Sequence, residues 1–299
     1  MGNDLNNALK AHSMMPHSQI NVQSLACVDI QDLKNCFNAA FQKYFVPSLL
    51  SHEQFAEKLT TEAIDLKLSF GLFDEDELVG FILYGIDNIG NQKLAYNSGI
   101  GILPEYRGYK LSYLLFEQSA VQLKMAGISK IRLEVIEQNA AALRIYQRIG
   151  FSITRRLNSY HGKPILNEID TIEIETLLVP DWELIKRNCE WNPSWQYSTN
   201  CIKRAQSKYT LQVARYDKVP VGYCISNFNT GRVAHFGCCN DIEDKEKYLG
   251  ALFSRVNGFN GDHFISVVNV DTNALYANTF LLSIGLSRLN TSCEMELTL

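Results

Sequence analysis

Apolar residues in the first half of the chain recur at two spacings, which predict a series of helices and strands. Over residues 29–41 and 53–61 they recur every three to four positions, the spacing of an amphipathic helix. Apolar runs bounded by turn residues predict strands at residues 20–25, 66–73, 78–86 and 94–103. The acidic turn at residues 74–76 separates the second of these strands from the third.

Helices and strands alternate after this antiparallel series. An amphipathic helix follows the strand at residues 94–103, and the pattern then predicts a strand at 131–136, a helix at 140–149 and a strand at 151–157. Antiparallel strands followed by strand, helix, strand, helix and strand are typical of an α/β fold. We expect a mixed, largely antiparallel sheet with helices on both faces.

The order of elements begins again from about Pro164. The hairpin of residues 75–103 returns as residues 217–239. The strand and helix of residues 130–152 return as residues 263–287. The second half therefore repeats the pattern of the first.

Glycines give the length of the repeat. Gly222 follows Gly80 by 142 positions, and Gly285 follows Gly150 by 135. Offsets that agree this closely indicate duplication of a whole domain rather than a short repeat. We predict a polar tail at residues 1–18 and two tandem domains at residues 19–164 and 165–299. A strand at residues 170–177 would bridge the two halves.

Composition limits the partners and the compartment. The 299 residues carry a formal net charge of −4 and a pI near 5.9, which argues against a general nucleic-acid binder. No apolar run approaches the ~20 residues of a membrane span, and the N-terminus lacks the apolar core of a signal peptide. We therefore expect a cytoplasmic protein. The eight cysteines form no C-x-x-C pair, which favours reduced thiols over disulfides or zinc ligands.

A helix without a conventional cap follows the strand at residues 94–103. The connection reads Pro-Glu-Tyr-Arg-Gly, residues 104–108, and no Ser, Thr, Asp or Asn precedes the helix. The first N–H groups of a helix have no intrahelical partner, and Gly108 lets an anion approach the backbone closely. The stretch is therefore typical of a phosphate site. Taken alone, however, an Arg-Gly pair at a turn is also the ordinary composition of a solvated corner.

A second motif, in residues 133–151, favours the phosphate site. It carries Asn139, Ala142, Tyr146, Gly150 and Phe151 at the spacing N-x-x-A-x-x-x-Y-x-x-x-G-F. This segment and the loop before it resemble the two hallmarks of the GNAT superfamily of N-acetyltransferases, whose loop reads V-x-P-x-x-R-G-x-G-x-G/A. The resemblance covers roughly residues 20–160, and the second half of the chain matches the family pattern only weakly.

The resemblance implies a site for acetyl-coenzyme A, the acetyl donor. Backbone N–H groups of the loop would hold the pyrophosphate, and the end of the preceding strand would pair with the pantetheine arm where two strands diverge. Asn139 would bond near the pantetheine or hold the loop after its strand. The residues implied for cofactor binding are Ile102, Leu103, Arg107, Gly108, Tyr109, Lys110, Leu111, Ser112 and Asn139.

The resemblance also implies catalytic roles for Tyr146 and Glu134. Tyr146 would protonate the departing thiolate, a task that suits a phenol; without the motif it would be interpreted as a core aromatic. Glu134, twelve residues earlier, matches the family branch that acetylates the N-terminal alanine of a ribosomal protein, where this glutamate acts as the base through water. In other relatives the same glutamate is structural, so both roles stay open. No first-half cysteine lies near the motifs, which favours direct attack by the amine.

Two positions of the loop depart from the family pattern. Lys110 stands where the family has glycine, and Ser112 stands where it has glycine or alanine. A lysine keeps its backbone N–H and adds a positive charge, but it loses the close approach that glycine allows. The aromatic segment at residues 44–47 stands where family members line the acceptor pocket, although the same residues can pack in the core.

The second copy departs further. A gap-free alignment of the second motif places Leu281 opposite the tyrosine and Ala274 opposite the asparagine. In the loop, Asp244 stands opposite the arginine and Lys245 opposite the glycine, and an acidic residue there would repel a diphosphate. We predict that the second copy keeps the fold and has lost the site. Its aromatic residues are interpreted as a core or interdomain cluster rather than an acceptor site: Trp182, Trp191, Trp195 and Tyr197.

These observations predict an enzyme that transfers an acetyl group from acetyl-coenzyme A to a primary amine. The acceptor would be a small molecule or a peptide, without a metal, a nucleic acid or a membrane as partner. The alternative is a non-catalytic acyl-coenzyme A-binding or scaffold protein whose first domain has drifted as the second has. Lys110 favours that alternative, whereas the intact Asn139 and Tyr146 oppose it.

Overall fold

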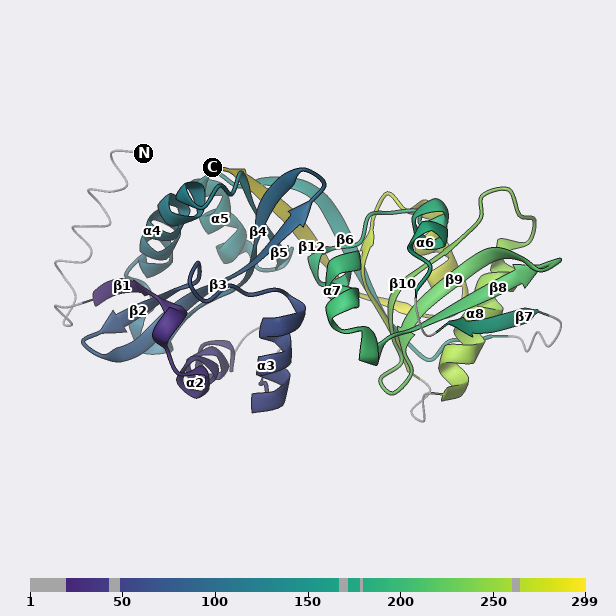
Figure 1. The fold of residues 1–299 in the computed structure, drawn as a ribbon, viewed down its shortest axis with the longest axis horizontal. Helices are drawn as coiled ribbons and strands as arrows, with labels where there is room; N and C mark the ends of the chain where they lie inside the picture. The colour runs from purple at the N-terminus through teal and green to yellow at the C-terminus, as the bar shows by residue number, and fades with distance from the viewer. Residues whose placement is uncertain (1–19, 43–48, 167–171, 178–179, 260–263) are drawn as a thin grey trace. The chain divides into compact units, whose positions relative to one another are not determined.

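The computed structural model describes residues 20–42, 49–166, 172–177, 180–259 and 264–299 (Figure 1). The chain forms two compact units. Unit 1 runs to Thr154 and also includes Met295–Leu299, and unit 2 is Arg155–Glu294. No helix in these described ranges is long and apolar enough to cross a membrane.

Unit 1 is built on a mixed sheet. Its strands lie in the order β1, β2, β3, β4, β5, with β12 next to β5. Neighbours from β1 to β4 are antiparallel, whereas β4 is parallel to β5. The bounds are β1 (Ile20–Ser24), β2 (Phe70–Asp74), β3 (Glu77–Ile89), β4 (Gln92–Ile102), β5 (Lys130–Ile136) and β12 (Ser287–Thr298).

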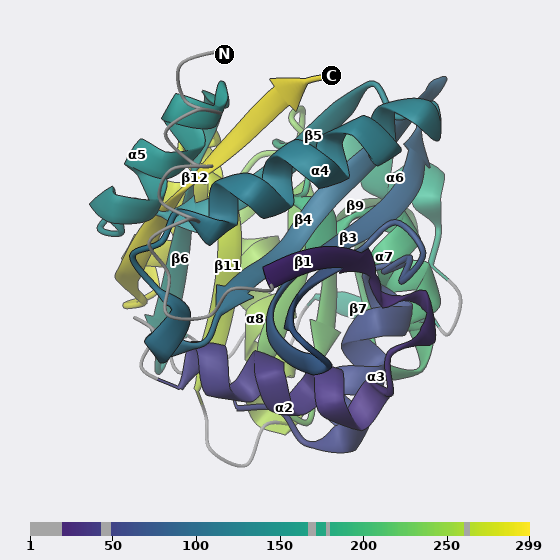
Figure 2. The same ribbon diagram turned by 90° about the vertical axis from the view of Figure 1, so that its left-hand side faces the viewer.

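Helices cover both faces of this sheet (Figure 2). One face carries α2 (Ile30–Phe41) and α3 (His52–Thr61), and the other carries α4 (Leu111–Met125) and α5 (Ala140–Ile149). Local sequence sets where the first two begin, because the side chains of Asp29 and Ser51 accept hydrogen bonds from N–H groups of the first turns. The predicted mixed sheet with helices on both faces is confirmed.

Unit 2 repeats this architecture. Its strands lie in the order β7, β8, β9, β10, β11, with β6 next to β11, and only the pair β10 and β11 is parallel. The strands are β6 (Ser152–Gly162), β7 (Glu173–Leu177), β8 (Thr210–Tyr216), β9 (Val219–Asn227), β10 (Arg232–Cys238) and β11 (Ile265–Asp271). The helices are α6 (Trp182–Asn188), α7 (Thr199–Arg204), α8 (Lys245–Phe259) and α9 (Leu275–Ser283).

The two repeats exchange their last strands. From Arg155 onward β6, the last strand of the first repeat, lies in unit 2, where it runs antiparallel to β11. The end of β12, the last strand of the second repeat, lies in unit 1. There Glu296 pairs with Arg132 on β5 at 2.6 Å and with Lys130 at 3.1 Å. Each unit is thus completed by chain from the other repeat.

Three predicted strands have different bounds in the structure. The strand predicted at residues 66–73 begins only at Phe70, because Asp65 and Ser69 fold the preceding residues into a turn. The strand predicted at 151–157 continues to Gly162, where it has β11 as a partner. Of the strand predicted at 170–177, the described part is β7, which pairs with β8 in unit 2.

Candidate functional site

Strands β4 and β5 separate before β4 ends. Their pairing runs only from Leu94 with Lys130 to Tyr96 with Arg132. Beyond this point β4 continues to Ile102 along β3, and β5 continues to Ile136 with β12 on its other side. The two strands therefore form a V in unit 1, closed at Tyr96 and open toward the helix α4.

The outer part of β4 directs backbone groups into this divergence. Leu103 N–H donates to Val79 O on the β3 side at 2.9 Å, so the alternate residues Ile100 and Ile102 direct their N–H and C=O groups away from β3. The strand is buried as far as Asn97. The half-exposed residues beyond it are Ser98, Gly99, Ile100 and Ile102. An extended ligand can pair with such a strand as an added strand would.

The start of α4 offers a set of backbone donors. Tyr113 N–H donates to Lys110 O, and Arg107 N–H donates to Pro104 O. Between them, the N–H groups of residues 108–112 have no acceptor within the described part of the chain. Because these five donors lie at the positive end of a 15-residue helix, they form a cradle for an anion with several oxygen atoms.

Two residues of this cradle have left-handed backbone. Gly108 has φ +89°, and a Cβ built there meets no atom within 4 Å, so the space above the backbone is open. Lys110 has φ 60°, a conformation that glycine adopts at no cost and that a lysine adopts at about 1 kcal/mol. The lysine thus adopts a backbone conformation that favours glycine, and its N–H is one of the five donors of the cradle. The residues fit a diphosphate.

Arg107 shapes the loop with its side chain. Its Nε donates to Ile102 O at 3.0 Å, and its Nη2 donates to Ala40 O at 2.8 Å. The guanidinium therefore ties the end of β4 to the end of α2. Since its backbone N–H is also used within the loop, Arg107 holds the cradle in position, and residues 108–112 supply the free N–H groups.

Asn139 and Tyr146 mark the start and the inner face of α5. Asn139 is 9% exposed and caps the helix, because its Oδ1 accepts from Ala142 N–H at 3.1 Å. The half-buried ring of Tyr146 meets the edge of Phe116 on α4 at 5.9 Å between centroids, and that of Phe151 at 5.7 Å. The tyrosine is therefore oriented by aromatic packing between α4 and α5.

Glu134 lies on β5, two residues beyond the last pair with β4. Every second residue of β5 is half-buried, which puts Glu134 on the face that carries Lys130 and Arg132. Glu296 accepts hydrogen bonds from both Lys130 and Arg132. Burial raises the pKa of the Glu296 carboxyl, but the hydrogen bonds and charges of these two cations lower it by more, so the pKa lies below its usual value. Lys130 and Arg132 thus share a carboxylate partner, Glu296, within unit 1.

Two further expectations concern unit 1. The aromatic segment at residues 44–47 lies outside the described residues. Among the thiols, burial is the main cause that raises the pKa of Cys36 to about 12, with smaller contributions from Glu77 and Glu105. Cys36 therefore carries a protonated, inert thiol at neutral pH, whereas Cys27 is exposed.

The family model described as the acetyltransferase (GNAT) family matches residues 30–151, and the match contains both the cradle and the Asn139–Tyr146 segment. The whole chain also has the fold of a tandem GNAT protein from the clavulanic acid biosynthesis pathway, with a TM-score of 0.70 at 10% identity, over 94% of this chain and 98% of that one. Residues 30–151 therefore contain a GNAT-family domain. The resemblance seen in the sequence is confirmed.

Two curated relatives match parts of this chain. N-alpha-acetyltransferase 30 of Schizosaccharomyces pombe is 26% identical over 150 residues, which are 50% of this chain and 89% of the relative. The ribosomal protein bS18-alanine N-acetyltransferase of Haemophilus influenzae is 31% identical over 97 residues, which are 32% of this chain and 63% of the relative. The chain therefore spans less than two thirds of the second relative's length.

Unit 2 contains the same divergence of two parallel strands, and a connection of the same chain enters it. Strands β10 and β11 pair only at Arg232 with Ser266 and Val233 with Val267. The connection between α6 and α7, residues 188–195, then passes from one face of the sheet to the other. Leu184 before it and Tyr197 after it belong to one core, whereas Trp191 belongs to the core on the opposite face.

Contacts on both sides hold residues 188–195 between the strands. His235 on β10 binds Trp191 O through Nε2 at 3.2 Å, and Asn269 on β11 donates from Nδ2 to Ser194 Oγ at 2.9 Å. The His235 ring also lies 4.2 Å from the Trp191 ring. Burial lowers the pKa of His235 to about 4, so the ring is neutral, donates to Trp191 O and accepts from the Tyr223 hydroxyl at 2.6 Å.

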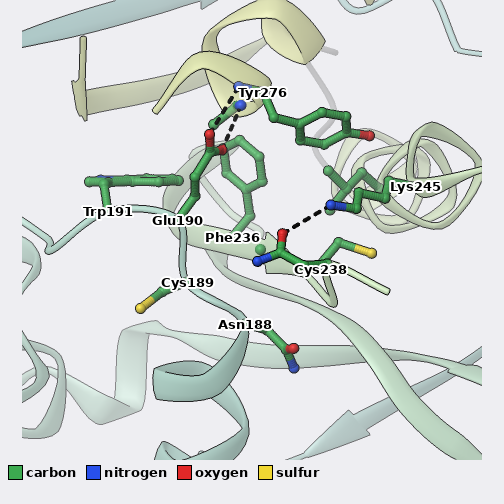
Figure 3. A pocket seen from close by; sticks show the side chains of 12 residues that line it. Asn188, Cys189, Glu190, Trp191, Phe236, Cys238, Lys245 and Tyr276 are labelled. Atoms are coloured by element: carbon green, nitrogen blue, oxygen red, sulfur yellow. Dashed lines mark hydrogen bonds between the residues drawn. The ribbon is translucent and has the colours of Figure 1, made fainter. Parts of the chain in front are cut away.

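Glu190, within residues 188–195, connects this segment to the start of α9 (Figure 3). Its two carboxylate oxygens accept the N–H groups of Tyr276 at 2.9 Å and Ala277 at 2.8 Å. A cavity of about 80 Å³ remains beside it, lined among others by Phe236, Cys238 and Lys245. The N-terminus of α9 is thus occupied by a carboxylate of the same chain.

The structure also sharpens the alignment of the repeats. Lys110 and Asp244 each precede a 15-residue helix in left-handed backbone, with φ 60° and 54°, so they are equivalent. The sequence alignment placed Asp244 opposite Arg107, three residues away, because it matched Phe253 with Phe116 rather than the two helix starts. Of the four aromatic residues interpreted as a core or interdomain cluster, Trp191, Trp195 and Tyr197 are buried in unit 2 and Trp182 is partly buried there. They do not form one cluster, because Trp191 and Tyr197 belong to different cores.

Two features were not found by sequence reasoning. One is the passage of residues 188–195 through the sheet, for which the only signal was the density of tryptophans. The other is Glu62, a buried carboxylate that follows α3 and reaches β4. In the sequence it stands in a polar turn, so nothing distinguished it from a solvated residue.

Proposed function

We propose that unit 1 transfers an acetyl group from acetyl-coenzyme A to a primary amine by direct attack. The observation that carries this proposal is the cradle of five acceptor-free N–H groups at residues 108–112, placed at the open end of the V between β4 and β5. The match of residues 30–151 to the GNAT family model and the acetyltransferase names of both curated relatives support it.

The chain offers a separate element for each part of the donor. The N–H groups of residues 108–112 would hold the pyrophosphate, with Lys110 adding a positive charge. The outward backbone groups of Ile100 and Ile102 would pair with the pantetheine arm. Bound in this way, the cofactor supplies a thioester as the activated acetyl group.

Glu134 and Tyr146 would move the protons of the reaction. Glu134, on the diverging part of β5, would accept the proton that the amine must lose, directly or through water. Tyr146, oriented by Phe116 and Phe151, would donate its hydroxyl proton to the departing thiolate. Asn139 would keep α5, and with it the tyrosine, in position by capping the helix.

The preferred acceptor is the α-amine of a peptide or protein. Both curated relatives are named as enzymes that acetylate such an amine, one in general terms and one on an alanine of a ribosomal protein. All eight cysteines are free, which suits the reducing cytoplasm as the compartment.

An acetylation assay with a panel of amines tests the proposal. The panel combines peptides that begin with Ala, Ser and Met with spermidine and an aminoglycoside, and the free thiol of coenzyme A is measured. We expect turnover with at least one peptide. Binding of coenzyme A without turnover on any amine would instead identify a non-catalytic acyl-coenzyme A-binding protein, and absence of binding would leave a scaffold.

A further inference from the structure

Glu62 is a buried carboxylate beside the closed end of the V. It follows α3 directly and is 7% exposed. Its Oε1 is paired with Lys58 at 2.8 Å, one turn back on the helix, and its Oε2 accepts a hydrogen bond of 2.5 Å from Ser98 on β4. A carboxylate removed from water in this way needs partners, and Lys58 and Ser98 both meet that need.

Ser98 occupies a special position on β4. The ladder to β3 pairs Gly99 with Leu83 and Asn97 with Tyr84, so Ser98 is the extra residue of a β-bulge. It is the first half-exposed residue of the strand and lies two residues beyond the last pair with β5. Glu134 lies two residues beyond the same pair on β5. Ser98 and Glu134 are therefore at the same level on the two arms of the V.

This level is where the reacting end of the donor would lie. From the cradle, the arm would follow β4 from Ile102 toward Ser98, a run of about 13 Å. The thioester would then reach the closed end of the V. The acceptor amine must approach the same point to attack it.

The equivalent level in unit 2 shows that polar side chains there bind what lies between the strands. Asn269 is equivalent to Glu134 and holds Ser194, and His235, next to the bulge of β10, holds Trp191. In unit 2 both partners belong to residues 188–195. In unit 1, Ser98 on β4 and Glu134 on β5 thus occupy the positions from which side chains can bind a ligand that lies between the strands.

We propose that Ser98, held by Glu62, positions the acceptor amine for attack. The inference rests on the proposed function. The single hydroxyl proton of Ser98 is donated to Glu62, so the oxygen has only lone pairs left for a ligand. An amine or ammonium N–H is the group that such an oxygen accepts. The carboxylate charge behind the hydroxyl strengthens this bond, and the amine is placed opposite Glu134.

Steady-state kinetics of Ser98→Ala and Ser98→Thr test this assignment, with the amine that gives the highest rate in the panel. For Ser98→Ala we expect KM for the amine to rise at least five-fold, with KM for acetyl-coenzyme A unchanged. Ser98→Thr keeps the hydroxyl and should recover most of the loss. Glu62→Gln should raise KM for the amine by a smaller factor, because it keeps the shape and removes the charge.

Ser69→Ala is the matched control. The Ser69 hydroxyl is buried and bonds only backbone groups, those of Asp65 and Tyr84, so its loss should lower the melting temperature and leave KM for the amine unchanged. If wild-type protein turns over and Ser98→Ala lowers only the melting temperature, as Ser69→Ala does, the positioning role is wrong while the proposed function stands. If wild-type protein acetylates no amine, the proposed function itself is wrong.

Discussion

The two units begin the same helix in different ways. In unit 1, Asn139 caps α5 with its own side chain, which accepts a hydrogen bond from Ala142 N–H. In unit 2 the equivalent residue is Ala274, which provides no side-chain bond, and Glu190 supplies both oxygens from a distant loop. A helix start left without its cap has thus acquired a carboxylate from elsewhere, because its N–H groups need acceptors once buried.

The diverging strands of the two units, β4 and β10, also differ in how far they are exposed. Beyond Asn97, β4 is half-exposed at every residue except Gly101, whereas β10 is buried from Val233 to its end. The connection that enters the divergence in unit 2, between α6 and α7, corresponds to the α2–α3 connection of unit 1, of which residues 43–48 lie outside the described residues. The comparison teaches that this fold keeps its V-shaped sheet when residues of the same chain, here 188–195, bind the diverging strands.

The largest expected effect is on catalysis in unit 1. Tyr146→Phe removes the proposed acid and should slow acetyl transfer at least ten-fold, because a positioned general acid contributes about 10²-fold or more. The equivalent residue of unit 2, Leu281, is fully buried, and Leu281→Met should leave the rate unchanged. Initial rates with saturating amine measure both. An unchanged rate in Tyr146→Phe would remove Tyr146 from the mechanism.

The next effect is on the stability of unit 2. Glu190→Ala leaves the N–H groups of Tyr276 and Ala277 without their acceptor and should lower the stability of unit 2 by about 2 kcal/mol. Hydrogen exchange of α9 peptides measures the loss. The rate of acetyl transfer should not change. Protection of α9 equal to that of the wild type would show that Glu190 does not hold residues 188–195 in place.

Acidification should weaken unit 2 through His235. Its folded pKa of about 4 lies below the ordinary value of 6.5, so the unfolded chain binds the proton first. The stability that the neutral ring contributes is complete above pH 6.5 and is lost as the pH falls toward 4, by about 2 kcal/mol at pH 5. Hydrogen exchange of unit 2 at pH 7 and pH 5 measures this. In His235→Gln the histidine contribution to the pH dependence should vanish, and its persistence would contradict the assignment.

The smallest effect concerns the starts of α4 and α8. Lys110→Gly and Asp244→Gly each relieve left-handed backbone and should each raise stability by about 1 kcal/mol, as seen in thermal denaturation. Lys110→Ala, which keeps a Cβ, is the control and should give no such gain. If both glycine variants were less stable than the wild type, the side chains of Lys110 and Asp244 would stabilise the protein by more than the left-handed backbone destabilises it.

Most of the fold was predictable because it depends on local patterns. The helix at residues 140–149 matches α5, since the motif contains both its cap, Asn139, and its left-handed end, Gly150. The cradle was predictable for the same reason, because an uncapped helix start and Gly108 stand next to each other in the sequence.

Features made by distant segments were not predictable. The exchange of β6 and β12 depends on which sheet edge each strand joins, and both edges have the same pattern in the two repeats. The bond from Glu62 to Ser98 joins residues 36 positions apart across β3. Glu190 and α9 are separated by 86 positions. No spacing rule in a single sequence connects such pairs.

The central claim is that unit 1 holds the coenzyme A site and that unit 2 has filled the equivalent position with its own residues. Isothermal titration of the whole chain with coenzyme A tests it most directly. We predict one molecule bound per chain, lost in Gly108→Val, because φ +89° excludes a β-branched residue, and retained in Asp244→Gly. Two molecules per chain, or one that still binds to Gly108→Val, would contradict the account.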